Sequence, residues 1–136
     1  MLANAIRRTV ARERRLTDSV GMRDLEELKE RLRAFVTERD WDQFHSPKNL
    51  SMALAVEAAE LVELFQWLTE EESAAPDATR RRRAAEELAD VLVYLVRIAD
   101  RLDIDLLQAA DEKLEQNALK YPAGRVRGQA RKYDEY

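Results

Sequence analysis

The chain has 136 residues, which is long enough for one domain with a hydrophobic core. Hydrophobic residues make up 46% and charged residues 37%, a mixture typical of amphipathic helices, and three glycines and three prolines leave little turn material for a β fold. A net charge of −4 gives no electrostatic reason to expect nucleic-acid binding, and the absence of cysteine excludes disulfides and thiolate metal sites. No apolar run reaches the roughly 20 residues that span a membrane, so we predict a cytoplasmic all-α protein without nucleic-acid or membrane partners.

Three segments are expected along the chain. Residues 1–21 form an Arg-rich extension that lacks the apolar region of a signal peptide, residues 22–122 form the patterned domain, and residues 123–136 form a polar tail. The domain begins with a helix from Leu25 to about Glu38, for which Asp24 is the expected N-cap.

Two aromatic residues and the only histidine lie in the connection that follows, RDWDQFHSPKNL. Ser46 and Pro47 are expected to be the N-cap and first residue of the next helix. Trp41, Phe44 and His45 either cover the core or form the wall of a pocket beside that helix N-terminus, where backbone N–H groups favour anions.

The stretch 50–68, LSMALAVEAAELVELFQWL, contains no glycine or proline and predicts one long helix. Its apolar residues go nearly all the way around, which indicates a buried helix. Glu57, Glu60 and Glu63 nevertheless lie in its middle, although an unpaired buried carboxylate is costly. Glu57 and Glu60 are neighbours on one face because they are three residues apart.

A second carboxylate pair follows a polar loop, 69–83, that we expect to be solvated. The Arg80–Arg83 run in this loop is unfavourable at a helix N-terminus and is typical of a solvated face, with phosphate binding as the alternative. The next helix is expected over about 82–102. It carries Glu87 and Asp90, which are again three residues apart among apolar residues.

The last predicted helix covers 105–121, begins at Asp103 or Asp105, and stops at Pro122. Lys113, Asn117 and Lys120 share one face of this helix, an arrangement that by itself is typical of a solvated stripe.

Three hypotheses compete for the carboxylate pairs. Two helices that each offer two carboxylates suit a Mg²⁺ site, with Mn²⁺ as a substitute, that handles a phosphorylated substrate. A di-iron four-helix protein would need a Glu-x-x-His motif on each of two helices, and His45 lies outside both carboxylate-bearing helices. A helical interaction protein with solvated glutamates is the third hypothesis. The strongly apolar setting of both pairs favours Mg²⁺.

These segments carry a family resemblance. RDWDQFHSPKNL, the pair Glu57-x-x-Glu60, ELFQW, EELADVLVYL and KYP follow one another over roughly 25–121. Together they resemble the MazG-type all-α nucleoside triphosphate pyrophosphohydrolases, and within these the dCTP pyrophosphatase branch. Leu32 departs from the pattern, since the branch has a histidine near that position.

The resemblance implies hydrolysis of a nucleoside triphosphate, dCTP or a related pyrimidine dNTP, to the monophosphate and pyrophosphate in nucleotide-pool housekeeping. It implies that the catalytic and Mg²⁺-binding residues are Glu57, Glu60, Glu87 and Asp90. The substrate contacts that it implies are Trp41, Gln43, His45, Trp67, Tyr94, Lys113, Asn117 and Lys120. A non-catalytic helical oligomerisation protein or nucleotide-binding protein is the alternative.

A homo-oligomer is expected because the helix over 50–68 is too apolar to be covered by three short helices of one chain. The resemblance implies a four-helix unit assembled as a tetramer with sites between subunits. No G-x-x-x-x-G-K-[ST] loop is present, which argues against P-loop γ-phosphoryl transfer. Trp67 and Tyr94, expected one to two turns from the carboxylates, would hold a base close enough to place the α-phosphate over them.

Overall fold

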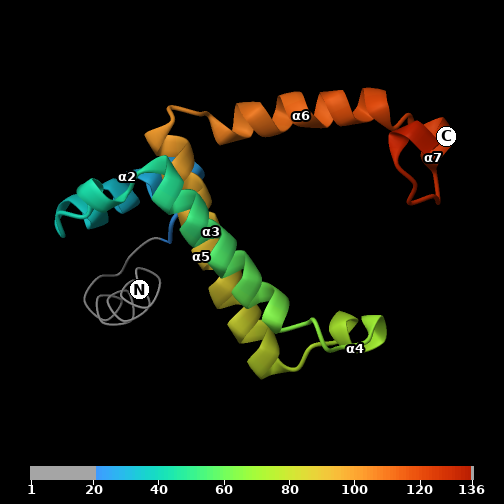
Figure 1. Cartoon of the computed structure of the whole chain (residues 1–136), viewed down its shortest axis with the longest axis horizontal. Helices are drawn as coiled ribbons and strands as arrows, with labels where there is room; N and C mark the ends of the chain where they lie inside the picture. The colour runs from blue at the N-terminus through green and yellow to red at the C-terminus, as the bar shows by residue number, and fades with distance from the viewer. Residues whose placement is uncertain (1–20, 136) are drawn as a thin grey trace.

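The computed structural model describes residues 21–135, and all regular structure in this part of the chain is helical (Figure 1). The elements in chain order are α2 (Leu25–Thr37), the 3₁₀ turn η1 (Asp42–Phe44), α3 (Pro47–Glu63), α4 (Glu70–Ala74), α5 (Ala78–Arg101), α6 (Leu106–Lys120), α7 (Ala123–Val126) and η2 (Tyr133–Glu135). The all-α prediction is therefore confirmed. The predicted extension over 1–21 lies almost wholly outside the described residues.

The two longest helices, α3 and α5, form an antiparallel hairpin, and α2 packs against the end of α5 (Figure 1). Leu28 and Leu32 on α2 bury themselves against Val96 on α5, with partly buried Leu25 and Val93 beside them. Along the hairpin, α3 buries few side chains, so the contact between α3 and α5 is a narrow seam rather than a broad core.

Helix starts follow the capping residues closely. The side-chain oxygens of Asp24 and Ser46 accept hydrogen bonds from the backbone N–H groups of Glu27 and Asn49, and Pro47 occupies the first position of α3. Asp105 accepts from two backbone N–H groups and begins α6. These predicted starts are confirmed because a cap needs only the local chain.

The start of α5 differs from the prediction. Asp77 accepts a hydrogen bond from the backbone N–H of Arg80, so α5 begins at Ala78 and the Arg80–Arg83 run lies inside its first turns. That backbone hydrogen bond holds the pKa of Asp77 below its ordinary value. A negative cap at the helix N-terminus offsets the unfavourable charges of these arginines.

The end of α3 also differs from the prediction. The helix stops at Glu63, and the chain from Leu64 to Leu68 continues in turns with hydrogen bonds such as Phe65 N–H to Val62 O, 3.0 Å. Thr69 and Glu72 then form a reciprocal capping box that begins α4 inside the predicted loop. The ELFQW segment is therefore a turn between two helices rather than the last turns of one helix. The polar tail contains two short helical turns, α7 and η2.

The fourth long helix, α6, does not close a bundle within this chain. It extends away from the α3–α5 hairpin after a turn in which Asp103 has φ 54°, a left-handed conformation that Asp tolerates better than most residues (Figure 1). Its Leu107, Leu114 and Leu119 are 67%, 67% and 83% exposed. The predicted four long helices are present, but in the described part of one chain the fourth contacts the core cluster only through Leu106, at its first residue.

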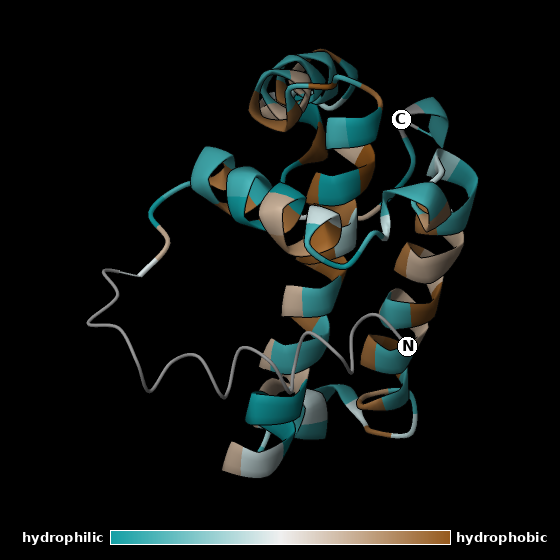
Figure 2. Cartoon of the chain, turned by 90° about the vertical axis from the view of Figure 1, so that its left-hand side faces the viewer, coloured by the Kyte–Doolittle hydropathy of each residue, from teal (hydrophilic) through white to brown (hydrophobic). Residues whose placement is uncertain are grey.

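The outer face of α3 is also uncovered, contrary to the expectation of a buried helix. Met52, Val56 and Val62 are each more than half exposed, and Leu88 on α5 is 54% exposed. The hydropathy colouring shows apolar positions (brown) interleaved with polar ones (teal) along the helices (Figure 2). Among residues 21–135, no helix is long and apolar enough to cross a membrane.

Candidate metal and nucleotide site

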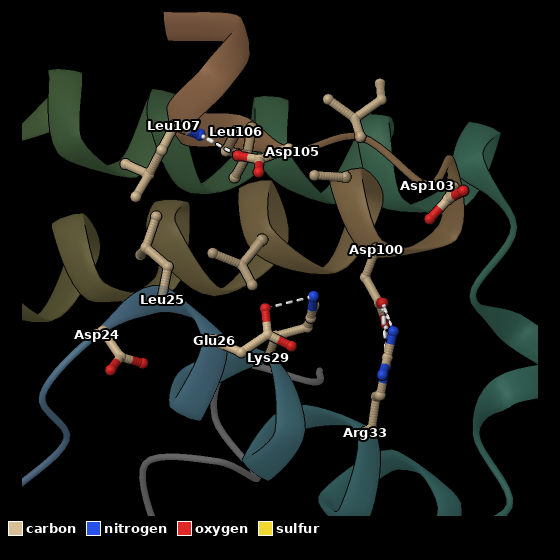
Figure 3. A pocket seen from close by; sticks show the side chains of 13 residues that line it. Asp24, Leu25, Glu26, Lys29, Arg33, Asp100, Asp103, Asp105, Leu106 and Leu107 are labelled. Carbon is tan, nitrogen blue, oxygen red and sulfur yellow. Dashed lines mark hydrogen bonds and ion pairs between the residues drawn. The ribbon is translucent and has the colours of Figure 1, made fainter. Parts of the chain in front are cut away.

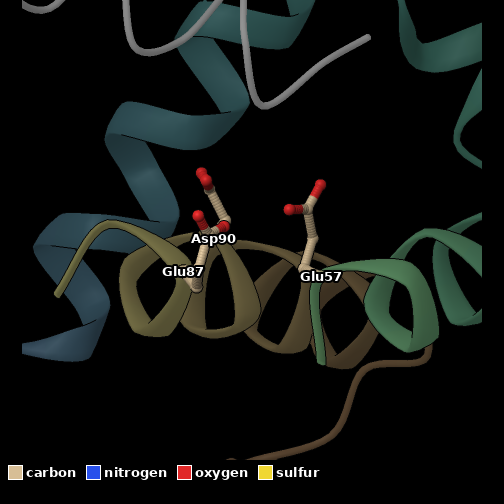
Figure 4. A group of neighbouring side chains, drawn as sticks. All are labelled: Glu57, Glu87 and Asp90. Atoms are coloured by element: carbon tan, nitrogen blue, oxygen red, sulfur yellow. The ribbon is translucent and has the colours of Figure 1, made fainter. Parts of the chain in front are cut away.

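Three buried carboxylates meet in the seam between α3 and α5. Glu57 comes from α3 and Glu87 and Asp90 come from α5, and one oxygen of each lies within 4.8 Å of the others (Figure 4). Their exposed fractions are 6%, 5% and 5%. Carboxylates so close together repel one another unless a cation lies between them, so their common position marks a candidate cation site.

Helical periodicity explains how the two elements deliver these groups. On α3 the inward positions are Leu50, Glu57 and then Leu64 just past the helix end, seven residues apart, which places all three on the face toward α5. Glu87 and Asp90 are three residues apart and therefore adjacent on α5. The two buried leucines lie about two turns before and after Glu57 on the same face of α3.

The remaining predicted carboxylate is placed differently. Glu60 is exposed and lies outside the three-residue cluster, as do the exposed Glu63 and Glu86. Glu60 follows Glu57 by nearly one turn of α3, so it lies at the border of the seam. The structure thus brings together three of the four residues that the sequence suggested as metal ligands.

The donor set of the cluster consists only of carboxylate oxygens. Hard divalent cations such as Mg²⁺ and Mn²⁺ prefer oxygen ligands, and Mg²⁺ commonly retains waters and binds substrate phosphates in addition to one or two carboxylates. Two helices rather than a mobile loop carry the ligands, which keeps their spacing rigid. These residues therefore fit a divalent cation that shares its coordination sphere with a phosphorylated ligand.

The aromatic connection between α2 and α3 is held against the helices. The Trp41 ring meets Phe35 of α2 edge-on, with centroids 5.9 Å apart, and is half-buried. The Gln43 side chain donates to the backbone oxygen and carboxylate of Asp40, at 3.0 and 2.8 Å, and is exposed. His45 is buried with 6% exposed. The connection from Trp41 to His45 thus forms an ordered wall at the N-terminal end of α3, which we call the aromatic wall.

Arg97 on α5, which the sequence did not single out, forms hydrogen bonds with this wall. Arg97 is 4% exposed, and its guanidinium donates to His45 Nδ1 at 3.3 Å, to Asp100 at 2.8 Å, and to Asp42. Thr37 on α2 donates to the other oxygen of Asp42, at 3.2 Å. The available signal was a single cation in the apolar run VLVYLVRIA, where an unpaired charge would be costly.

Asp100 links the same cluster to α2. Its carboxylate accepts two hydrogen bonds from Arg33 Nε, at 3.0 and 3.1 Å, and one from Arg97 (Figure 3). Burial by itself raises the pKa of Asp100, but hydrogen bonds and charge from Arg33, together with the charge of Arg97, outweigh it and hold that pKa below its ordinary value. Asp100 thus favours its ionised form and forms ion pairs with both arginines, while Asp42 supplies a second carboxylate to Arg97.

A pocket of about 350 Å³ lies beside this cluster, between the start of α2, the end of α5 and the start of α6 (Figure 3). Asp100 and Arg33 line it, together with leucines from α2 and α6. None of the three clustered carboxylates lines this pocket. It is therefore separate from the candidate cation site.

The other predicted substrate contacts fall into separate regions. Tyr94 is buried on α5 one turn after Asp90, on the side of the carboxylates. Trp67 lies in the turn after α3, is 87% exposed, and is at the opposite end of the hairpin from His45. The α6 residues, Lys113, Asn117 and Lys120, lie on the helix that projects away, and both lysines are exposed. One chain therefore does not bring the predicted nucleoside contacts into one place.

The sequence and the fold of this chain are similar to those of known proteins. The model of the MazG-like family matches residues 52–136. The chain is 47% identical over 113 residues to dCTP pyrophosphatase 1 of Homo sapiens, covering 82% of this chain and 66% of that protein, and 47% identical over 111 residues to the Bos taurus protein of the same name. The chain thus spans slightly less than two thirds of the length of these curated relatives. A solved pyrophosphatase from Archaeoglobus fulgidus superposes with a TM-score of 0.70 at 37% identity, covering 78% of this chain and 99% of that one.

Proposed function

This chain belongs to the MazG-like family, and we propose that it is a divalent-metal-dependent nucleoside triphosphate pyrophosphohydrolase of the cytoplasm. The proposed substrate is dCTP or a related pyrimidine dNTP, the products are the monophosphate and pyrophosphate, and the role is nucleotide-pool housekeeping. The observation that carries this proposal is the buried cluster of Glu57, Glu87 and Asp90 in a chain whose relatives are named dCTP pyrophosphatases.

The three clustered carboxylates are the proposed ligands of Mg²⁺, or of Mn²⁺ in its place, with Glu60 as a fourth ligand from the border of the seam. When bound, such an ion neutralises charge on the substrate phosphates. A carboxylate outside the cluster has room to accept the proton of the attacking water. Glu60, Glu63 and Glu86 are exposed on the same two helices and are the candidates for this base.

The attacked atom is proposed to be the α-phosphorus. Tyr94 lies about one turn from Asp90 on α5, and the wall of Trp41, Gln43 and His45 is tied to the same helix through Arg97. A nucleoside held by this wall and Tyr94 stays within two turns of the carboxylates. That spacing favours placing the α-phosphate, rather than the γ-phosphate, at the cluster.

The nucleotide site is proposed to be completed by other copies of the chain in a homo-oligomer, and we favour a tetramer. Uncovered apolar side chains on α3, α5 and α6 support this assembly. Trp67 lies too far along the hairpin to join His45 in one chain, and Lys113, Asn117 and Lys120 project away on α6. A second copy that packs on the exposed faces would supply these residues to a neighbouring cluster.

Single-turnover hydrolysis of a panel of dNTPs and NTPs, followed by chromatography, tests the reaction. We expect the monophosphate and pyrophosphate to appear together, with dCTP or a 5-substituted cytosine nucleotide fastest and with activity abolished by EDTA and restored by Mg²⁺. A nucleoside diphosphate and orthophosphate at early times would show attack at the γ-phosphorus. A chain that binds nucleotides without turning over any of them would be a binding protein instead.

A further inference from the structure

The guanidinium of the buried Arg97 donates hydrogen bonds to three side chains, one on α5 and two in the wall before α3. Asp100 lies on α5 itself, whereas Asp42 and His45 belong to the wall before α3. Arg33 also pairs with Asp100, and Arg101 lies 3.9 Å from the carboxylate of Asp42. The hydrogen bonds of Arg97 therefore determine how the wall sits against α5.

The chemistry of the Arg97–His45 contact determines the position of a proton. A guanidinium is always protonated in proteins and has donors only. Arg97 Nε–H, 3.3 Å from His45 Nδ1, must therefore donate to the lone pair of that nitrogen. A neutral imidazole with an acceptor at Nδ1 carries its hydrogen at Nε2.

The surroundings of the ring favour the neutral state. Burial is the largest cause that lowers the pKa of His45, and the nearby charge of Arg97 lowers it further. Asp42 acts in the opposite direction and raises that pKa, while Arg101 lowers it. The net pKa of His45 lies below the ordinary value for histidine, which favours the neutral ring.

Arg97 also shares a helix face with the carboxylates. Glu87, Asp90, Tyr94 and Arg97 follow one another at spacings of three, four and three residues, and all four are buried. The distance along α5 from Asp90 to Arg97 is about 10.5 Å, at 1.5 Å per residue. One rigid helix face thus sets both the carboxylate cluster and the orientation of His45.

We propose that Arg97 is a positioning residue of the nucleotide site, which holds His45 as the neutral Nε2–H tautomer and thereby makes His45 a hydrogen-bond donor to an acceptor atom of the base. This inference rests on the proposed function, because it places His45 beside the substrate. Cytosine presents acceptors at O2 and N3, to which an Nε2–H group is complementary. A histidine with the proton on Nδ1 would present an acceptor at Nε2, which could pair with the cytosine N4 amino group but not with O2 or N3.

The single histidine of the chain makes the first test direct. ¹⁵N spectra of the full, untagged chain give the shifts of the two ring nitrogens of His45 without assignment by mutation. We expect the wild type to show the Nε2–H tautomer and a pKa below that of a free histidine. A wild-type spectrum with the proton on Nδ1 overturns the inference without any variant.

Arg97→Met provides the second test. It removes every side-chain donor but keeps most of the side-chain length, while Asp100 retains Arg33 and Asp42 retains Thr37 and Arg101. We expect a mixture of tautomers, a raised His45 pKa, and a KM for dCTP about tenfold higher with kcat unchanged, as for one lost hydrogen bond. Arg97→Lys keeps the charge but loses the forked geometry of the guanidinium. Its tautomer mixture and its KM should therefore lie between those of the wild type and Arg97→Met.

Arg101→Met is the matched control, since it removes a neighbouring cation on the same helix that forms no hydrogen bond with His45. It should leave the tautomer and the KM as in the wild type. If Arg97→Met keeps the wild-type tautomer and KM, Arg97 does not position His45. If the wild type hydrolyses no triphosphate, the proposed function fails, whereas the nitrogen spectra still decide the contact between Arg97 and His45.

Discussion

At the scale of single residues, this protein buries several charged side chains along one face of α5. The face of α5 that meets α3 and the aromatic wall carries two carboxylates, a phenol and a guanidinium. A stability argument would place aliphatic residues there, because burying an ion costs several kcal/mol unless it is paired or bound to a cation. This polar face coincides with the proposed cation site and with the contact between Arg97 and the aromatic wall.

The carboxylates give the residue-scale prediction. Glu57→Gln, Glu87→Gln and Asp90→Asn should each lower kcat/KM by more than about 100-fold, since even outer-shell partners of a metal cost 10–100-fold. The variants should remain folded by circular dichroism, because removing one of several repelling charges relieves strain. Pyrophosphate release and calorimetric Mg²⁺ titration measure the effect.

Two further variants make that experiment specific. Glu30→Gln, on the exposed side of α2, removes the same charge far from the seam and should retain wild-type turnover. Glu60→Gln reports whether this exposed residue is a fourth ligand, since a ligand variant loses Mg²⁺ affinity along with activity. Near wild-type turnover by any of the three buried variants would remove that residue from the metal site.

At the scale of elements, the helix starts are determined by single capping side chains, and α3 depends on Ser46. Its hydroxyl accepts the Asn49 N–H at 3.2 Å, and Pro47 presets the first helical φ. The start of α3 follows the aromatic wall directly. Loosening this cap would therefore affect both the helix that carries Glu57 and the wall that carries His45.

Ser46→Ala should lower the free energy of unfolding by about 1 kcal/mol, the usual cost of a lost N-cap. Ser51→Ala is the matched control, because Ser51 lies exposed inside the same helix and only bonds back to Lys48 O. That substitution should stay within about 0.5 kcal/mol of the wild type. Urea unfolding of the three proteins measures the difference, and equal losses for both serines would show that the cap contributes nothing specific.

At the scale of the whole molecule, apolar side chains of α6 and α3 are exposed in the described chain, and we propose that another copy of the chain packs on them. Isolated exposed leucines are ordinary, but α6 carries several along a helix that contacts the core of the described chain only at its start, through Leu106. Packing of α6 on another copy would bury these leucines. The same contact would bring Lys113, Asn117 and Lys120 to a neighbouring site.

We expect sedimentation velocity at micromolar concentration to show an oligomer, and Leu114→Glu to shift it toward monomer with a loss of activity. Gln116→Glu introduces the same charge at another exposed position of α6 and should leave the assembly unchanged. A well-folded wild-type monomer that hydrolyses dCTP at full rate would contradict both the assembly and the shared site.

The sequence by itself determined the helical class, most helix starts and the pairing of Glu87 with Asp90, because caps and three-residue spacings act within one turn of the chain. It also carried the family resemblance, which the MazG-like match confirms. Only the tertiary structure decided that Glu57 rather than Glu60 faces α5, since the rotation of α3 about its axis depends on packing along the whole hairpin. It likewise decided that Trp67 lies in a turn and that Arg97 reaches His45, 52 residues away in sequence. Contacts between distant segments depend on how helices dock, and no local pattern in either segment encodes that docking.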